Sequence, residues 1–200
     1  DSKVAITYFG RANAKIRLGN ITGALEDIEV TIQLDPGFAQ AYYTRATVKI
    51  ESKKFSTQIT INISKEGGAV QHIQDSEFDK SYLIEVLYDY NKALELKSDF
   101  SEAYINRGIV FRELGAYTKA KNDFDEGVRL APEAARSYVN RASTYLLTNN
   151  LEDALADLET AITLDKDLSE AYLNRGHVKN LLGRLEEAIE DFSVVLEKTS

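Results

Sequence analysis

Apolar residues in the stretch 101–132 form two helical stripes separated by a single glycine. The first stripe repeats at steps of three and four residues, as one face of a helix requires, and its members are Ala103, Tyr104, Gly108, Val110, Phe111 and Leu114. The second stripe consists of Tyr117, Ala120, Phe124, Val128 and Leu130. Gly115 breaks the pattern between the stripes, and Pro132 follows the second one. The pattern therefore predicts two antiparallel helices joined by a short turn.

The same unit recurs at a fixed spacing further along the chain. Tyr104 aligns with Tyr138 and Tyr172, and this spacing falls in the range of the helical-repeat families, at about 34 residues. The same shift superimposes two more triplets, which are Asn106 with Asn140 and Asn174, and Arg107 with Arg141 and Arg175. Because a helix of about this length is marginal by itself, we expect the units to stabilise one another by packing.

Small residues recur where the two helices of a unit must approach closely. Gly108 and Ala120 occupy these positions, since a larger side chain there would force the helices apart. Together with Phe124, Pro132 and the fixed spacing of the units, they resemble the tetratricopeptide repeat. The resemblance implies an all-α fold, a right-handed α-solenoid of antiparallel helix pairs. In this family the helix pair is an interaction module.

Five such units divide the chain. We expect repeats at about residues 5–38, 39–100, 101–134, 135–168 and 169–200, which form a single solenoid domain over residues 1–200. The second unit is longer than the others by most of a repeat, and the surplus lies near residues 56–83. Its first part alternates Ile59, Ile61 and Ile63 with polar residues. This alternation predicts a β-hairpin from Thr57 to Gln74, after a first helix that ends at about Phe55.

The end of the last repeat carries apolar residues that a following helix would normally cover. Terminal repeats need a polar outer face, whereas this one has Val194, Val195 and Leu196. Two alternatives are open here: the chain continues beyond Ser200, or this C-terminal edge pairs with a partner. Homo-oligomerisation is therefore expected to use this edge or the strand edge of the hairpin.

Composition narrows the range of partners. Lysine and arginine number 24 against 32 acidic residues, and the resulting net charge of −8 argues against a nucleic acid partner. The chain has no cysteine, which excludes disulfides, thiolate nucleophiles and cysteine-bound zinc. It has no run of apolar residues long enough to span a membrane and no signal-peptide pattern. We therefore expect a soluble chain without membrane insertion, in a compartment that the sequence leaves open.

A charged pair recurs in every unit, with an arginine in the first helix and an aspartate in the second. The pairs are Arg11 with Asp27, Arg45 with Asp89, Arg107 with Asp123, Arg141 with Asp157, and Arg175 with Asp191. We interpret them as structural ion pairs that fix the angle between the two helices, which bidentate geometry would favour. The alternative is a row of arginines that binds anionic groups.

An asparagine precedes the arginine in the last three units, as Asn106, Asn140 and Asn174. A side chain at this position is expected to point into the concave groove formed by the first helices, where a carboxamide can both donate to and accept from a peptide backbone. We assign further residues, several of them apolar, to the same groove: Phe9, Tyr43, Ile105, Ile109, Arg136, Val139, Leu173 and His177. The alternative is that the asparagines bond to the neighbouring repeat and fix the stacking.

Signals for catalysis are few. His72 and His177 lie in different elements without a second metal ligand at helical spacing, so no metal site is expected. No glycine-rich phosphate loop, nucleophile elbow or HExxH motif occurs, and we predict no catalytic residues and no cofactor. The sequence thus favours a non-catalytic scaffold that binds a peptide segment of a partner protein. The alternatives are a structural homo-oligomerisation module and the accessory interaction domain of a larger enzyme.

Overall fold

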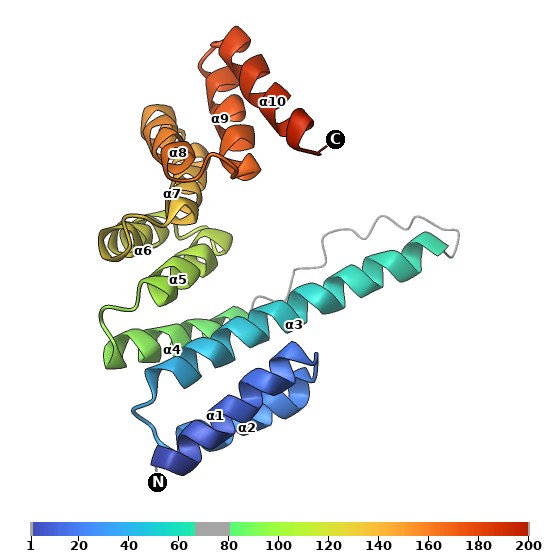
Figure 1. The fold of residues 1–200 in the computed structure, drawn as a ribbon, viewed down its shortest axis with the longest axis vertical. Coiled ribbons are helices and arrows are strands. Elements are labelled where there is room, and N and C mark those ends of the chain that lie inside the picture. Colours follow the sequence, from blue (N-terminus) through green and yellow to red (C-terminus); the bar gives the residue numbers. More distant parts are fainter. Residues whose placement is uncertain (1, 67–80, 200) are drawn as a thin grey trace. The chain divides into compact units, whose positions relative to one another are not determined.

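The structure, a computed structural model, describes residues 2–66 and 81–199. Within these residues the regular elements are helices, labelled α1 to α10, and there is no strand (Figure 1). The expected all-α fold of antiparallel helix pairs is therefore confirmed. The chain divides into two compact units, Asp1–Ser98 (unit 1) and Asp99–Ser200 (unit 2). The expectation of a single domain over residues 1–200 stays a prediction.

Unit 1 contains two helix pairs. In the first pair α1 (Ser2–Arg17) packs on α2 (Ile21–Leu34), and in the second α3 (Ala39–Glu66) packs on α4 (Ser81–Leu96). The two pairs are joined by packing of α2 on α3. Figure 1 shows that α3 extends well past the helix on which it packs.

Unit 2 contains three helix pairs of nearly equal length. The pairs are α5 (Ser101–Glu113) with α6 (Tyr117–Leu130), α7 (Ala135–Leu147) with α8 (Leu151–Leu164), and α9 (Ser169–Leu181) with α10 (Leu185–Thr199). Neighbouring pairs are joined by packing of α6 on α7 and of α8 on α9. In addition, α7 contacts both α5 and α9, so the first helices of the three pairs lie side by side.

A residue with left-handed backbone ends the first helix of four pairs. Gly19, Gly115 and Gly183 have φ angles of 74°, 74° and 75°, and Asn149 has a φ of 59°. This conformation stops a helix, and glycine adopts it without the steric cost that a side chain brings. The equivalent residue of the second repeat is Lys53, and there α3 continues to Glu66.

The predicted β-hairpin is wrong over its first strand. Residues 57–66, which hold the alternating isoleucines, belong to α3, and the rest of the predicted hairpin lies outside the described residues. The first helix of this repeat also ends at Glu66 rather than at Phe55. Extending an existing helix requires no new nucleus, and the β preference of isoleucine depends on its surroundings. Without a left-handed stop, helix extension therefore prevails.

The second helices bury large side chains, among them Tyr90 in α4, Phe124 in α6 and Leu158 in α8. In two pairs the large side chain lies against a glycine of the first helix: Phe124 against Gly108, and Phe192 against Gly176. A Cβ atom added to Gly108 would lie only 2.8 Å from the ring of Phe124. The close approach of α5 and α6 therefore requires glycine at this position.

Candidate functional site

The structure brings together each of the five arginine–aspartate pairs between the two helices of one repeat. The distances from Nη2 to Oδ1 are 2.6 Å for Arg11 and Asp27, 2.5 Å for Arg45 and Asp89, 2.7 Å for Arg107 and Asp123, 2.7 Å for Arg141 and Asp157, and 2.6 Å for Arg175 and Asp191. In every pair Nε also donates to Oδ2, so the contact is bidentate. All five aspartates are buried.

The recurring tyrosine three residues before each arginine belongs to the same arrangement. In each repeat the centre of its ring lies between 5.0 and 5.7 Å from the guanidinium carbon. A guanidinium over an aromatic face is attracted by the negative face of the ring. The tyrosine therefore helps to hold the arginine in the orientation that its aspartate needs.

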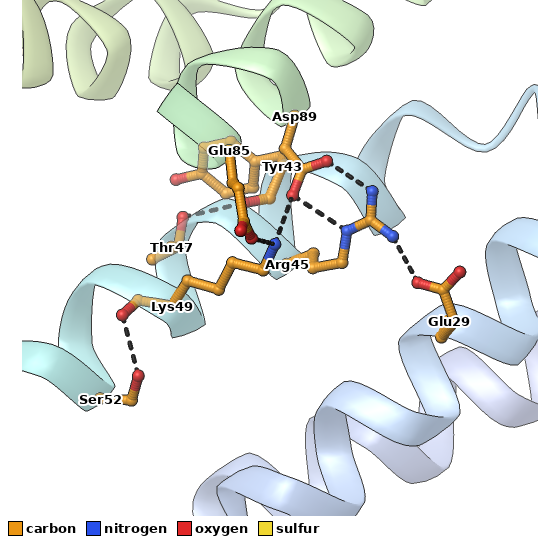
Figure 2. A network of polar contacts seen from close by, with 8 residues as sticks. All are labelled: Glu29, Tyr43, Arg45, Thr47, Lys49, Ser52, Glu85 and Asp89. Carbon is orange, nitrogen blue, oxygen red and sulfur yellow. Dashed lines mark hydrogen bonds and ion pairs between the residues drawn. The ribbon is translucent and has the colours of Figure 1, made fainter. Parts of the chain in front are cut away.

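Two of the arginines also reach back to the preceding repeat, a contact that sequence reasoning missed. Arg45 Nη1 contacts Glu29 of α2, and Arg141 Nη1 contacts Asp125 of α6 at 2.8 Å. Figure 2 shows Arg45 lying between Glu29 and Asp89. We call this three-residue arrangement the clasp: an arginine, the aspartate of its own repeat and an acidic residue of the preceding one. It ties the helix pair together and fixes its stacking on the neighbouring pair.

A signal for the clasp is present in the sequence. Three repeats carry an acidic residue two positions after the paired aspartate, and these residues are Glu29, Asp125 and Glu159. The third of them, Glu159, also acts on the next arginine. The pKa of Arg175 is raised, first by the hydrogen bonds that it donates to Asp191 and further by the negative charge of Glu159. Alignment of the second helices would have found this acidic position.

Lysines supply a second positive charge to three of the buried aspartates. The nearest Nζ–Oδ distances are 2.8 Å from Lys15 to Asp27, 3.8 Å from Lys49 to Asp89, and 2.9 Å from Lys179 to Asp191. The hydrogen bond that Arg11 donates lowers the pKa of Asp27 to about 2. Burial alone would raise this pKa, and the bond from Lys15 also lowers it. Burial raises the pKa of Asp191, but the bonds from Arg175 and Lys179 outweigh it and the pKa is lowered. Both carboxylates are therefore fixed charges at neutral pH and unsuited to proton transfer.

A cavity of about 340 Å³ opens beside the clasp of unit 1. Its charged lining consists of Arg45, Lys49, Glu85 and Asp89, which pair with one another (Figure 2). In the other four arginine–aspartate pairs the guanidinium group is likewise bound by its aspartate. This geometry favours the structural reading of the arginines over the anion-binding alternative.

The three asparagines lie on adjacent helices of unit 2, since α5, α7 and α9 lie side by side. Asn106, Asn140 and Asn174 are all half-buried. Asn174 Nδ2 donates a long hydrogen bond of 3.5 Å to Ser143 Oγ on α7. This contact is of the kind that the stacking alternative requires.

The other residues assigned to this surface in unit 2 divide into two groups. Ile109 is half-buried, Leu173 is 39% exposed, and Arg136 and His177 are exposed. Val139, by contrast, is 2% exposed and belongs to the core cluster of α7, α8 and α9. Its assignment to the groove is therefore wrong.

Ile105 also packs within its own repeat. A Cβ atom added to Gly127 of α6 would lie 2.2 Å from Ile105 Cδ1, so this side chain fills the space that the glycine leaves. Ile105 is half-buried as a result. It supports the α5–α6 contact.

The two aromatic residues assigned to the groove in unit 1 have packing partners. Phe9 meets Phe38 edge to face, with ring centres 4.9 Å apart. Tyr43 lies against Tyr90, with ring centres 6.0 Å apart. Both Phe9 and Tyr43 are half-buried. These contacts account for the aromatic character of the two positions without a ligand.

The described part of the chain offers neither a metal site nor a membrane-spanning helix. No group of three or more histidine, aspartate or glutamate side chains in residues 2–66 and 81–199 could hold a metal ion. None of the described helices combines the length and the apolar character needed to cross a bilayer. His72 lies outside the described residues.

Helix pairs that recur at a fixed spacing, each packed on its neighbours, define a helical-repeat protein. Comparison with known proteins agrees. The family model described as "Tetratricopeptide repeat" matches residues 105–169 and 148–200. In the curated proteins, the tetratricopeptide repeat and J domain-containing co-chaperone DNJ1 of Cryptococcus neoformans is 37% identical over 49 residues, which are 24% of this chain and 9% of that protein. This chain is a tetratricopeptide repeat protein.

Solved structures show the same fold at low sequence identity. MamA from Desulfovibrio magneticus RS-1 has a TM-score of 0.76 and 17% identity, with 98% of this chain and 94% of that chain covered. YrrB has a TM-score of 0.70 and 18% identity, with coverage of 97% and 86%. PilF of Pseudomonas aeruginosa has a TM-score of 0.73 and 17% identity, with coverage of 98% and 77%. At this level of identity the likeness shows the shared fold, which is consistent with a protein–protein interaction scaffold.

Proposed function

We propose that unit 2 binds an extended peptide segment of a partner protein on the face formed by α5, α7 and α9. The observation that carries the proposal is the asparagine at one position on three first helices that lie side by side. We call this surface the asparagine face. It consists of Asn106, Asn140 and Asn174 together with Ile109, Arg136, Leu173 and His177.

The asparagine face combines two kinds of contact that an extended peptide needs. Carboxamides can bond to main-chain N–H and C=O groups of a peptide whatever its sequence. The partly exposed Leu173 and the half-buried Ile109 offer apolar area for its side chains. We therefore expect broad affinity with a modest preference for apolar residues. The role is non-catalytic binding.

The comparisons support this reading at the level of the fold. YrrB is described as "a TPR protein with an unusual peptide-binding site". DNJ1 is named a co-chaperone that contains tetratricopeptide repeats and a J domain. The chain spans 9% of that relative, so the proposal for this chain rests on its own asparagine face.

The test replaces Asn106, Asn140 and Asn174 by alanine together. Peptides are first selected on the wild-type chain from an unbiased phage-displayed library, and their Kd values are then measured for both proteins. A hydrogen bond contributes about 0.5–1.5 kcal/mol, so losing three should weaken binding roughly ten- to a thousandfold.

Two controls make this result interpretable. Asn122→Ala, on an exposed position of α6, should leave the Kd values unchanged. Circular dichroism should show the same helicity for all variants, because the asparagines contribute little to the core. Selected peptides that bind the triple variant as tightly as the wild type would refute the asparagine face. The same conclusion would follow if deletion of residues 67–80 alone abolished binding.

A further inference from the structure

The last helix presents an apolar stripe at positions that are covered in the repeat before it. In α8, Leu151 and Leu155 pack in the core cluster shared with α9. A shift by one repeat places Leu185 and Ile189 at the same positions of α10. These two side chains are 52% and 65% exposed. Their apolar character matches that of the residues with which α8 holds the first helix of the following repeat.

The first helix of the chain presents the counterpart of this surface. The residues that pack against α8 from the α9 side are Leu168, Ala171, Val178 and Leu182. The equivalent positions at the start of the chain hold Val4, Thr7, Ala14 and Leu18. Val4 is 42% and Leu18 83% exposed. The surface is hollowed, because Ala14 and Leu18 help to line a cavity of about 510 Å³ along α1.

The two helices also carry opposite charge. Helix α1 contains four basic residues and no acidic one, namely Lys3, Arg11, Lys15 and Arg17. Helix α10 contains five acidic residues and one lysine, namely Glu186, Glu187, Glu190, Asp191, Glu197 and Lys198. Opposite charges on two surfaces favour their encounter and fix their orientation.

We propose that α10 of one copy stacks on α1 of a second copy, in the way that α8 packs on α9 within the chain. The contact joins two different surfaces, so each bound copy leaves one surface available at either end. Association is therefore expected to proceed beyond a dimer. This inference is independent of the asparagine face and concerns a separate surface.

The contact between copies lacks the clasp. Arg11 holds the position of Arg45 and Arg141, but the acidic position that it would meet on α10 is occupied by Ser193. The intermolecular contact therefore has apolar packing and long-range charge attraction without the ion pair found between neighbouring repeats. We expect it to be reversible and dependent on concentration.

Two variants that each block one surface provide the test, with molecular mass followed by sedimentation over a roughly hundredfold range of concentration. Ile189→Arg places a positive charge opposite the basic α1, and Ala14→Arg fills the hollow on α1. Each should lower the association constant roughly ten- to a hundredfold, since a buried aliphatic contact contributes about 1.5–3 kcal/mol. An equal mixture should stop at a dimer, because it contains one intact pair of surfaces.

The matched control is Ala156→Arg, which adds the same charge at an exposed position of α8 outside both surfaces and should associate like the wild type. Raising the salt concentration should weaken association, because screening reduces attraction between opposite charges. A wild-type chain that stays monomeric throughout would overturn the proposal. So would loss of association in Ile189→Arg but not in Ala14→Arg, which would indicate a symmetric contact between two copies of α10.

Discussion

Units 1 and 2 use the same ion pair between helices but end their first helices differently. In unit 2 the first helices are each stopped by a residue in the left-handed conformation just beyond the last helical turn, namely Gly115, Asn149 and Gly183. In unit 1 the second repeat has Lys53 at this position, and α3 continues to Glu66. The buried pair of Arg45 and Asp89 is nevertheless formed there as in the other repeats. Helix pairing and helix length are therefore controlled by separate residues.

The largest effect is expected from breaking the ion pair in the repeat with the long helix. Asp89→Ala removes the bidentate partner of Arg45, whose side chain is only 15% exposed. We expect a loss of about 3 kcal/mol in the free energy of unfolding, measured with urea, because the buried guanidinium loses both of its bonds to Asp89 and keeps only the exposed Glu29 as a partner. Glu29→Ala, the control on the exposed side of the same clasp, should cost less than about 1 kcal/mol. Equal losses for the two variants would contradict the larger contribution of the buried pair within the clasp.

A smaller effect is expected from exchanging the helix stops. Gly115→Ala forces a side chain into a φ of 74° and should cost about 1–2 kcal/mol in the free energy of unfolding. Gly10→Ala, inside α1 with nothing within 4 Å of the added Cβ, should instead stabilise by about 0.5–1 kcal/mol. In the reverse exchange, Lys53→Gly should lower the hydrogen-exchange protection of residues 54–66. Unchanged protection there would show that the stop residue does not control the length of α3.

The last effect is a loss of stability in acid, and it appears only at low pH. The pKa of Asp27 is about 2 in the folded chain against 3.8 ordinarily, so the folded state binds fewer protons than the unfolded one. Its contribution is complete above about pH 4 and is lost as the pH falls toward about 2. Urea unfolding of the wild type and of Asp27→Asn should therefore differ most at neutral pH and converge in acid. If the two free energies of unfolding differed by a constant amount from neutral pH to about pH 2, the lowered pKa of Asp27 would be refuted.

Much of the fold follows from local rules that the sequence displays directly. The fixed spacing of the repeats predicted the helix pairs, and the paired Arg107 and Asp123 lie together as helical spacing suggests. These features depend on contacts within one repeat. A pattern repeated with the same residues in each unit reports such contacts well.

The features that were missed depend on neighbouring structure. The helical state of residues 57–66 follows from the missing stop at Lys53, a local rule that outweighs the alternating isoleucines. Val139 is buried because α7 packs against both α8 and α9. Ile105 turns toward α6 because Gly127 stands where the other repeats have a larger residue. Each requires knowledge of a partner helix that helical periodicity alone does not supply.

The clasp also limits how such a chain can grow by gene duplication. Its arginine lies in one repeat and its second acid in the repeat before, so a duplicated segment keeps the contact only if it carries both. A tandem copy of residues 101–134 would place Asp125 before a new Arg107 and preserve the contact. A copy of residues 39–100 would place Asn91 before a new Arg45 and lose it. Recombination between repeats therefore yields unequal products, and selection for stability would favour expansion through repeats that carry the acidic position, such as the third.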